Sequence, residues 1–336
     1  MSQLDEHRAR EPGRGRRVAA VIVCLTALLV VAAAGAMAIV ERVAAPRDLL
    51  IPRSGALFGA FVGMTGVPTP EASERAVAAF ESTIGRKLDV DHHFYPWAVP
   101  FPTAVERWDL ANDRIPMISW HGDDTIAIAS GSQDPLIRSR AIAVRNLDAP
   151  VFLRWGWEMD GGRNAPWVHS PSAYIAAWRH LRQIFTDEGA TNAIWVFCPN
   201  AYGFTTGRAQ AYFPGAAYVD WVCADGYNWA PDRKNAPWEP FDRIFARFST
   251  WATKVAKPAM IGETGALERQ PGEKAAWLQA AYTSVRRSMP AVHAVVYFNI
   301  DKLESDGASY DWRVTSSESA LQAFIAVSRD PYFTTR

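Results

Sequence analysis

The sequence predicts a (β/α)8 TIM barrel preceded by an N-terminal transmembrane helix. The chain has 336 residues, 49% of them hydrophobic, and a formal net charge of +0, which suits one large globular domain. Apolar or β-branched runs recur eight times between residues 56 and 299, and helical stretches separate most of them. Eight strands alternating with helices over roughly 270 residues suit a closed α/β barrel better than an open sheet.

The N-terminus has the pattern of a membrane anchor. Residues 1–17 are polar and Arg-rich, and residues 18–40 carry no charge. An apolar segment of this length can span a bilayer as a helix, and the basic flank places residues 1–17 in the cytoplasm. A cleaved signal peptide is the alternative, because Ala36-Met37-Ala38 fits a small-residue cleavage site. In both cases we expect a linker over residues 41–53 and the barrel domain, residues 54–330, outside the cell.

The expected strands are short apolar runs that end at polar or turn-forming residues. They cover Ala56–Val62, Leu88–Tyr95, Ile115–Ser119, Val151–Arg154, Ala193–Cys198, Trp221–Ala224, Ala259–Gly262 and Val292–Asn299.

Two of the intervening helices have clear start and stop signals. The helix after the fourth strand has Ser170 as a cap and Pro171 in its first turn, and it ends before Gly189. Its apolar stripe consists of Tyr174, Trp178, Leu181 and Phe185. The helix Glu71–Ile84 begins after Thr69-Pro70 and ends before Gly85.

The composition gives no sign of a cofactor, a metal or nucleic-acid binding. No Gly-rich phosphate loop and no Cys/His spacing of a metal site occurs in the sequence. The balanced charge lacks the basic excess of nucleic-acid-binding proteins. Cys24 lies in the apolar N-terminal segment, and Cys198 and Cys223 lie near the ends of consecutive strands, where we expect buried free thiols.

Two glutamates stand where a barrel of this kind has its active site. Glu158 follows the fourth strand and Glu263 follows the seventh, and the C-terminal strand ends form the catalytic face of TIM barrels. Paired carboxyl groups suit glycosidic bond cleavage, although either one alone could be a salt-bridged surface residue. If the pleat continues, Arg154, Gly156 and Glu158 share a face, and the arginine favours an ionised carboxylate nearby.

The order and spacing of several motifs resemble glycoside hydrolase family 26, the family of β-mannanases. The resemblance covers residues 58–314. Its motifs are His92-His93-Phe94-Tyr95, Ile118-Ser119-Trp120, the segments 151–167, 177–180, 195–200 and 218–229, Ile261-Gly262-Glu263-Thr264-Gly265, Phe298-Asn299-Ile300-Asp301-Lys302 and Asp311-Trp312-Arg313. The resemblance implies a retaining mechanism with Glu158 as acid/base and Glu263 as nucleophile. It also implies that Tyr227 hydrogen-bonds the nucleophile.

The sequence departs from the family beside the acid/base. Trp157 stands where the family usually has a histidine, which helps to shape the subsite for the cleaved sugar, and an insertion at residues 303–310 changes one wall of the cleft.

Further substrate contacts are expected from aromatic residues and histidines near the strand ends, and a structural role is the alternative for each. The candidates are Trp120, Trp157, Trp167, Trp229, Trp312, His93 and His121, with Trp167 and Trp312 favoured as sugar platforms.

The sequence thus predicts a retaining hydrolase that cuts a β-linked polysaccharide, with endo-β-1,4-mannan as the leading substrate. A β-1,3-xylanase, a mixed-linkage β-glucanase and a non-catalytic carbohydrate-binding barrel are the alternatives. We expect a monomer whose partners are the polysaccharide and, through the N-terminal helix, the membrane.

Overall fold

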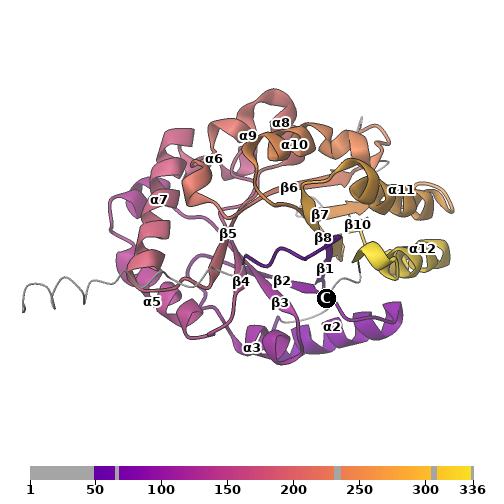
Figure 1. The fold of residues 1–336 in the computed structure, drawn as a ribbon, viewed down its shortest axis with the longest axis horizontal. Coiled ribbons are helices and arrows are strands. Elements are labelled where there is room, and N and C mark those ends of the chain that lie inside the picture. The colour runs from indigo at the N-terminus through magenta and orange to yellow at the C-terminus, as the bar shows by residue number, and fades with distance from the viewer. Residues whose placement is uncertain (1–48, 65–67, 231–235, 304–308, 334–336) are drawn as a thin grey trace, which may run out of the picture. The chain divides into compact units, whose positions relative to one another are not determined.

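The computed structural model describes residues 49–64, 68–230, 236–303 and 309–333. Eight parallel strands form a closed barrel in sequence order, and β8 pairs with β1 to close it (Figure 1). The strands are β1 (Leu57–Val62), β2 (Val90–Tyr95), β3 (Ile115–Trp120), β4 (Val151–Trp155), β5 (Ala193–Phe197), β6 (Trp221–Asn228), β7 (Ala259–Ala266) and β8 (Val292–Asn299). The predicted (β/α)8 barrel is confirmed.

Helices surround the barrel and cover the outward faces of its strands (Figure 1). They are α2 (Pro70–Ile84), α3 (Ala104–Ala111), α4 (Thr125–Ala129), α5 (Asp134–Arg145), α6 (Ala165–Val168), α7 (Pro171–Asp187), α8 (Ala201–Thr206), α9 (Arg208–Ala211), α10 (Phe241–Val255), α11 (Glu273–Ser288) and α12 (Glu318–Ser328). The paired strands β9 (Asp301–Leu303) and β10 (Ser309–Asp311) follow β8, one at each end of the predicted insertion.

The expected helix caps are present. The side chain of Thr69 accepts a hydrogen bond from the backbone of Ala72, and Ser170 accepts one from Ala173. Gly85 ends α2 in the left-handed region, at a φ of 74°. These short-range signals act within one turn of helix, which is why the sequence alone predicts them well.

Alternation along each strand divides the core into two layers. Inward side chains such as Met117, Phe152 and Val196 fill the barrel, while outward ones such as Leu153 and Trp195 pack against the helices. Both faces of the strands are therefore buried. An apolar run in the sequence marks such a strand but does not say which of its residues point inward.

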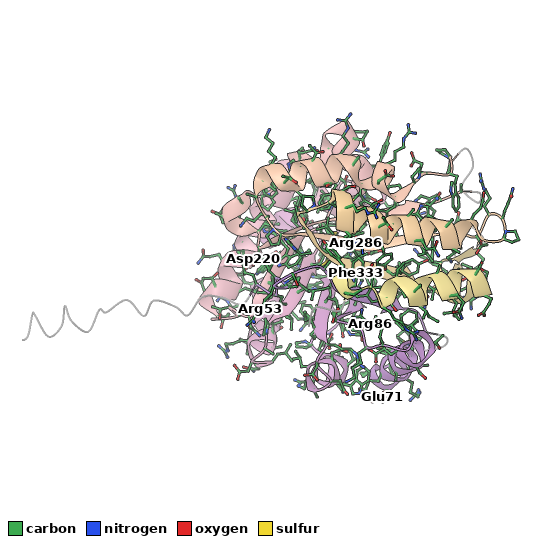
Figure 2. The ribbon with its side chains drawn as sticks, turned by 45° about the vertical axis from the view of Figure 1, so that its right-hand side comes forward. Arg53, Glu71, Arg86, Asp220, Arg286 and Phe333 are labelled. Carbon is green, nitrogen blue, oxygen red and sulfur yellow. A yellow bond between two sulfur atoms is a disulfide. The ribbon has the colours of Figure 1, made fainter. Side chains whose placement is uncertain are left out.

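The C-terminal end of the described chain is fastened to the start of the barrel, where the amide of Ala56 donates to the carbonyl of Tyr332 at 2.9 Å. Arg86, in the α2–β2 loop, donates from Nη1 to the carbonyl oxygens of Ser328 and Phe333, at 2.7 Å each. Figure 2 labels Arg86 and Phe333 at this junction. At the N-terminal end of the described chain, the indole of Trp221, on β6, donates to the carbonyl of Leu49 at 2.7 Å.

Two strands extend further than their apolar runs. The sequence ends the sixth strand at Ala224 and the seventh at Gly262, whereas β6 continues to Asn228 and β7 to Ala266. The predicted anchor over residues 18–40 lies outside the described residues. Within the described ranges, none of the helices has the length and apolar character needed to cross a membrane.

Candidate active site

Arg154 is the centre of a buried polar network at the C-terminal end of the barrel. Its side chain is fully buried. Its Nη1 donates to both carboxylate oxygens of Asp225, at 2.9 and 2.7 Å, and its Nη2 donates to Oε1 of Glu263. Its Nε donates to Oγ of Ser119 at 2.7 Å. The planar guanidinium thus ties together strands β3, β4, β6 and β7 through charge-assisted bonds.

His92 completes this network from β2. Its Nε2 lies 2.6 Å from Oγ of Ser119 and 3.2 Å from Nη2 of Arg154. Burial, and then the positive charge of Arg154, lower the pKa of His92 well below its ordinary value. The ring is therefore a neutral member of the network near neutral pH.

Glu263 points into the barrel because β7 contains a bulge. Cys223 of β6 pairs with Met260, whereas Asp225 pairs with Glu263, so β7 uses one residue more than β6 over this stretch. Strict alternation from Met260 would point Gly262 inward and Glu263 outward. The extra residue reverses that order and re-aims the glutamate.

Two donors orient the carboxylate of Glu263. Arg154 donates to Oε1, and the hydroxyl of Tyr227 donates to Oε2. Tyr227 therefore stands where the resemblance placed it, in contact with the expected nucleophile. With both oxygens fixed, the carboxylate has one defined direction of approach to a substrate.

Glu158 stands on the loop after β4 rather than on the strand. Both Gly156, at φ 55°, and Glu158, at φ 52°, adopt the left-handed backbone conformation. The pleat therefore does not continue, and the expected common face with Arg154 is wrong. For a non-glycine residue this conformation costs on the order of 1 kcal/mol, and the bond from Glu158 N to the Cys198 carbonyl, at 2.8 Å, helps to hold it.

Trp167 supports the loop that carries Glu158. Its indole donates to Oδ1 of Asn164 at 3.2 Å, and Nδ2 of Asn164 donates to the carbonyl of Glu158 at 2.8 Å. The Trp167 ring also lies against Gly156, where an added Cβ would be 3.1 Å from it. This predicted sugar platform is half-buried and packs against the loop.

The environment of Glu158 gives it the pKa of an acid/base group. Burial, followed by the negative charge of Glu263, raises the pKa of Glu158 to about 7, against the opposing effect of Arg154. A carboxyl group with a pKa near 7 can donate a proton and later accept one at neutral pH.

An open pocket of about 340 Å³ lies beside the network. Its lining is mostly aromatic and consists of Phe94, Tyr95, Pro96, His121 and Trp157. The guanidinium carbon of Arg154 lies 5.2 Å from the centre of the Trp157 ring and 5.5 Å from that of Phe94. Trp157 and His121 are thus together at this pocket, and its flat walls suit the apolar face of a sugar ring.

His93 lies away from the network. It points outward from β2, and its Nε2 is 2.8 Å from Oδ2 of Asp109 on α3. Burial opposes protonation, but the carboxylates of Asp91 and Asp109 raise the pKa of His93 to about 10. The expectation that His93 contacts substrate is therefore wrong, because the strand's alternation places it behind the barrel wall.

Two predicted sugar-binding tryptophans are buried. Trp120 is 0% exposed on β3, stacks on Trp97 and donates its indole N–H to the carbonyl of Trp97. Trp312 is 1% exposed and packs against Tyr227 and Trp229. Neither offers a ring face to a sugar, so both predictions of substrate contact are wrong. Trp229 is half-buried beside Trp312.

Cys198 and Cys223 form a disulfide with a Cα–Cα distance of 4.3 Å, so the expectation of free thiols is wrong. Both residues belong to the inward layer: Cys198 directly follows β5 and Cys223 lies on the neighbouring β6, which brings their sulfurs together. Gly262 lies against the disulfide: a Cβ there would be 3.0 Å from Cys198 Sγ and 2.8 Å from Asp225 Oδ1. The bulge next to Glu263 therefore requires glycine at this position.

Sequence reasoning missed four members of the site, namely His92, Ser119, Asn164 and Asp225. A polar residue within an otherwise apolar strand is the signal that could have found Asp225 and Ser119. His92 and His93 are adjacent, and only the strand's orientation distinguishes them.

The fold and the two carboxyl groups define an enzyme class. A closed (β/α)8 barrel carries one carboxyl group with a pKa near 7 and one carboxylate fixed by an arginine and a tyrosine, at strand ends four and seven. Such a pair of carboxyl groups is typical of a glycosidase active site. Residues 136–282 match the family model of glycosyl hydrolase family 26, so this part of the barrel resembles that glycosidase family.

One relative matches most of this chain. The chain is 34% identical over 284 residues to Endoglucanase H of Acetivibrio thermocellus, a match that covers 81% of this chain and 30% of that protein. The chain thus spans less than a third of the length of this relative.

Solved structures share the fold. A GH26 β-mannanase from Bacteroides ovatus matches with a TM-score of 0.58 and 17% identity, over 83% of this chain and 90% of that one. Fungal β-1,4-galactanases match with a TM-score of 0.58 and 11% identity, over 81% of this chain and all of theirs.

Proposed function

We propose that the protein is a retaining endo-β-glycanase with Glu263 as the nucleophile and Glu158 as the acid/base. The observation that carries this proposal is the difference between the environments of the two carboxyl groups. Arg154 and Tyr227 orient Glu263, while burial gives Glu158 a pKa of about 7. Two carboxyl groups with different environments in one cleft are the pattern of an acid and a nucleophile.

In the first step, Glu263 attacks the anomeric carbon and the glycosidic bond breaks. Glu158 transfers its proton to the departing oxygen, so the leaving sugar departs as a neutral alcohol. The product is a glycosyl ester on Glu263. Loss of the proton leaves a negative charge on Glu158, which Arg154 and Lys302 counter electrostatically.

In the second step, water replaces the leaving sugar. Glu158 takes a proton from the water as its oxygen attacks the anomeric carbon, and the ester bond to Glu263 breaks. Both carboxyl groups return to their starting protonation states. Two inversions give net retention of the anomeric configuration.

A β-glucan containing 1,4 linkages is the substrate that we propose, and β-1,4-mannan is the second candidate. The glucan is supported by the 34% identity to Endoglucanase H over most of this chain. Family resemblance supports mannan, but Trp157 replaces the histidine that the family usually places beside the acid/base. An indole donates one hydrogen bond and accepts none, so the subsite for the cleaved sugar differs from one built with imidazole.

The test is a reducing-sugar assay on carboxymethyl cellulose, mixed-linkage β-glucan, β-1,4-mannan and β-1,3-xylan. We expect the highest kcat/KM on one of the two glucans and the β-anomer as first product in proton NMR. A preference for mannan would establish the second candidate. Inverted product would refute the assigned mechanism, and binding without turnover on every substrate would indicate a carbohydrate-binding barrel instead.

The proposed location is the outer face of the cell membrane, and it rests on the sequence of residues 1–40 alone. The full chain should fractionate with membranes when produced in bacteria, whereas residues 53–336 should remain in the soluble fraction. A mature N-terminus at Ile39 would show that the segment is a cleaved signal peptide.

A further inference from the structure

Lys274 is buried at a position where two local effects disfavour a lysine. It is the second residue of α11, and its side chain is 0% exposed. The N-terminus of a helix carries partial positive charge, so an ammonium group there is repelled. Burial adds the cost of removing a charge from water. Such a local conflict is typical of a residue with a tertiary role.

The ammonium group of Lys274 binds the segment that follows β10. Its Nζ donates to the carbonyl of Arg313 at 2.6 Å, to Oγ of Ser316 at 2.9 Å and to the carbonyl of Asp311 at 3.4 Å. All three of its N–H donors are engaged. The first turn of α11 thereby holds the backbone on both sides of Trp312.

Trp312 itself is held from the barrel. The hydroxyl of Tyr297, on β8, donates to the carbonyl of Trp312 at 2.8 Å, and the amide of Trp312 donates to the carbonyl of Ile300 at 2.8 Å. Lys274 thus binds the carbonyls of residues 311 and 313, and Tyr297 binds the carbonyl of residue 312 between them. We call this arrangement the Lys274 clamp.

The Lys274 clamp holds Trp312 in contact with Tyr227, the residue that donates a hydrogen bond to Glu263. The ring centres of Trp312 and Tyr227 are 4.8 Å apart. A Cβ added at Gly265, two residues after Glu263, would lie 3.0 Å from Trp312 and 3.7 Å from Tyr227. Trp312 is therefore packed without spare room between Tyr227 and β7, and a shift of Trp312 would move the hydroxyl that Tyr227 donates to Glu263.

We propose that Lys274 is a positioning residue for the nucleophile, acting through Trp312 and Tyr227 on Glu263. The inference rests on the proposed function, because it assigns a role in the attack by Glu263. Lys274 does not touch the reacting atoms. Its contribution is to the orientation of a carboxylate, so its loss should lower kcat more than it changes KM.

The three bonds of the Lys274 clamp also depend on the charge of the ammonium group. Burial lowers the pKa of Lys274 to about 8, although Asp311 and Glu268 favour the charged form; Arg313 opposes it. The ammonium form, with three donors, is present below pH 8. As the pH rises through 8 the neutral amine has two N–H groups, so one clamp bond is lost.

The test compares Lys274→Met with Lys274→Arg and with the surface control Lys254→Met on α10. We expect Lys274→Met to lower kcat on dinitrophenyl β-glycosides at least tenfold, with KM changed less than threefold. The leaving group needs no acid, so the first step on these substrates, measured as the burst of dinitrophenol, reports the attack by Glu263 separately from the second step that uses Glu158 as base. Lys274→Arg keeps the charge at every pH, and it should restore kcat to within about threefold and remove a loss of activity centred near pH 8. Lys254→Met should match the unmodified protein.

A folded Lys274→Met variant with unchanged kcat and pH profile would overturn the proposal. If that variant does not fold, Tyr297→Phe removes the other clamp donor with a smaller change, and an unchanged kcat there would overturn it equally. If the larger arginine side chain prevents Lys274→Arg from folding, the pH dependence is tested on the unmodified protein with the same substrates. A kcat that stays constant between pH 7 and 9 would refute the pH dependence.

Hydrogen exchange separates this inference from the proposed function. Lys274→Met should speed exchange of peptides covering residues 309–316 and 221–228, whatever the substrate is. Faster exchange in the first peptide alone would show that the clamp holds Trp312 without reaching Tyr227. Full activity of Glu263→Ala would refute the proposed function itself and would leave the exchange result standing.

Discussion

The ends of β4 and β7 carry the two candidate catalytic glutamates and hold them by different means. Glu263 lies within β7, is turned inward by a bulge, and has both oxygens bound by side-chain donors. Glu158 lies on a loop in a left-handed conformation, where burial and the charge of Glu263 raise its pKa to about 7. The β7 site therefore fixes the orientation of the Glu263 carboxylate, and the β4 site sets the pKa of Glu158.

The largest effect should come from the β7 site. Glu263→Ala should lower kcat on every substrate by on the order of 10⁵-fold or more, because no other group forms the covalent intermediate. The measurement is kcat with and without azide, together with the configuration of the glycosyl azide. Rescue of this variant to an azide product of retained configuration would mean that the two roles are reversed. Glu71→Ala, on the surface of α2, is the control.

The β4 site should show a smaller and substrate-dependent effect. Glu158→Ala should lower kcat on polysaccharide by about 10² to 10⁴-fold, the usual contribution of a general acid. Dinitrophenyl glycosides should keep their first step, since their leaving group departs without a proton. Azide should then speed release of the intermediate with retained configuration. Equal losses on both kinds of substrate would contradict the assignment of Glu158 as the acid.

Arg154 links the two sites, so its removal should affect stability as well as turnover. Arg154→Met leaves Asp225 and Glu263 without their buried partner, which should lower the free energy of unfolding by about 3–5 kcal/mol. Urea denaturation monitored by tryptophan fluorescence measures this change. Arg247→Met, exposed on α10, should stay within about 0.5 kcal/mol of the unmodified protein. A loss below 1 kcal/mol for Arg154→Met would show that the network is not needed for stability.

The smallest expected effect is that of pH, and it tests the pKa of Glu158 directly. Glu158 must be protonated to act as the acid, so activity is present below its pKa of about 7 and is lost as the pH rises through that value. On polysaccharide, kcat/KM should fall about tenfold per pH unit above the pKa. The same limb should be absent from Glu158→Ala acting on dinitrophenyl glycosides. A limb that persists there belongs to another group.

Features that act over a few residues could be read from the sequence. The eight apolar runs, the caps at Thr69 and Ser170, and the glutamates at the ends of the fourth and seventh runs all depend on local patterns. The motif order then placed Tyr227 beside Glu263, and the structure has that contact.

Whether a side chain points into or out of the barrel was harder to predict from the sequence. His92 enters the network while its neighbour His93 lies behind the wall, and Trp120 and Trp312 are buried. Both faces of a parallel barrel strand are covered, so the sequence shows no polar face against which alternation can be read.

The sequence by itself determined the number and order of the strands, the positions of the capped helices, and which strand ends carry carboxyl groups. Tertiary structure decided that β7 bulges at Gly262 and turns Glu263 inward, that Cys198 meets Cys223, and that Asp225 pairs with Arg154. The reason is physical. Strand and helix signals arise within one segment, whereas the register between neighbouring strands depends on how all eight close around one core, and a one-residue slip exchanges the two faces.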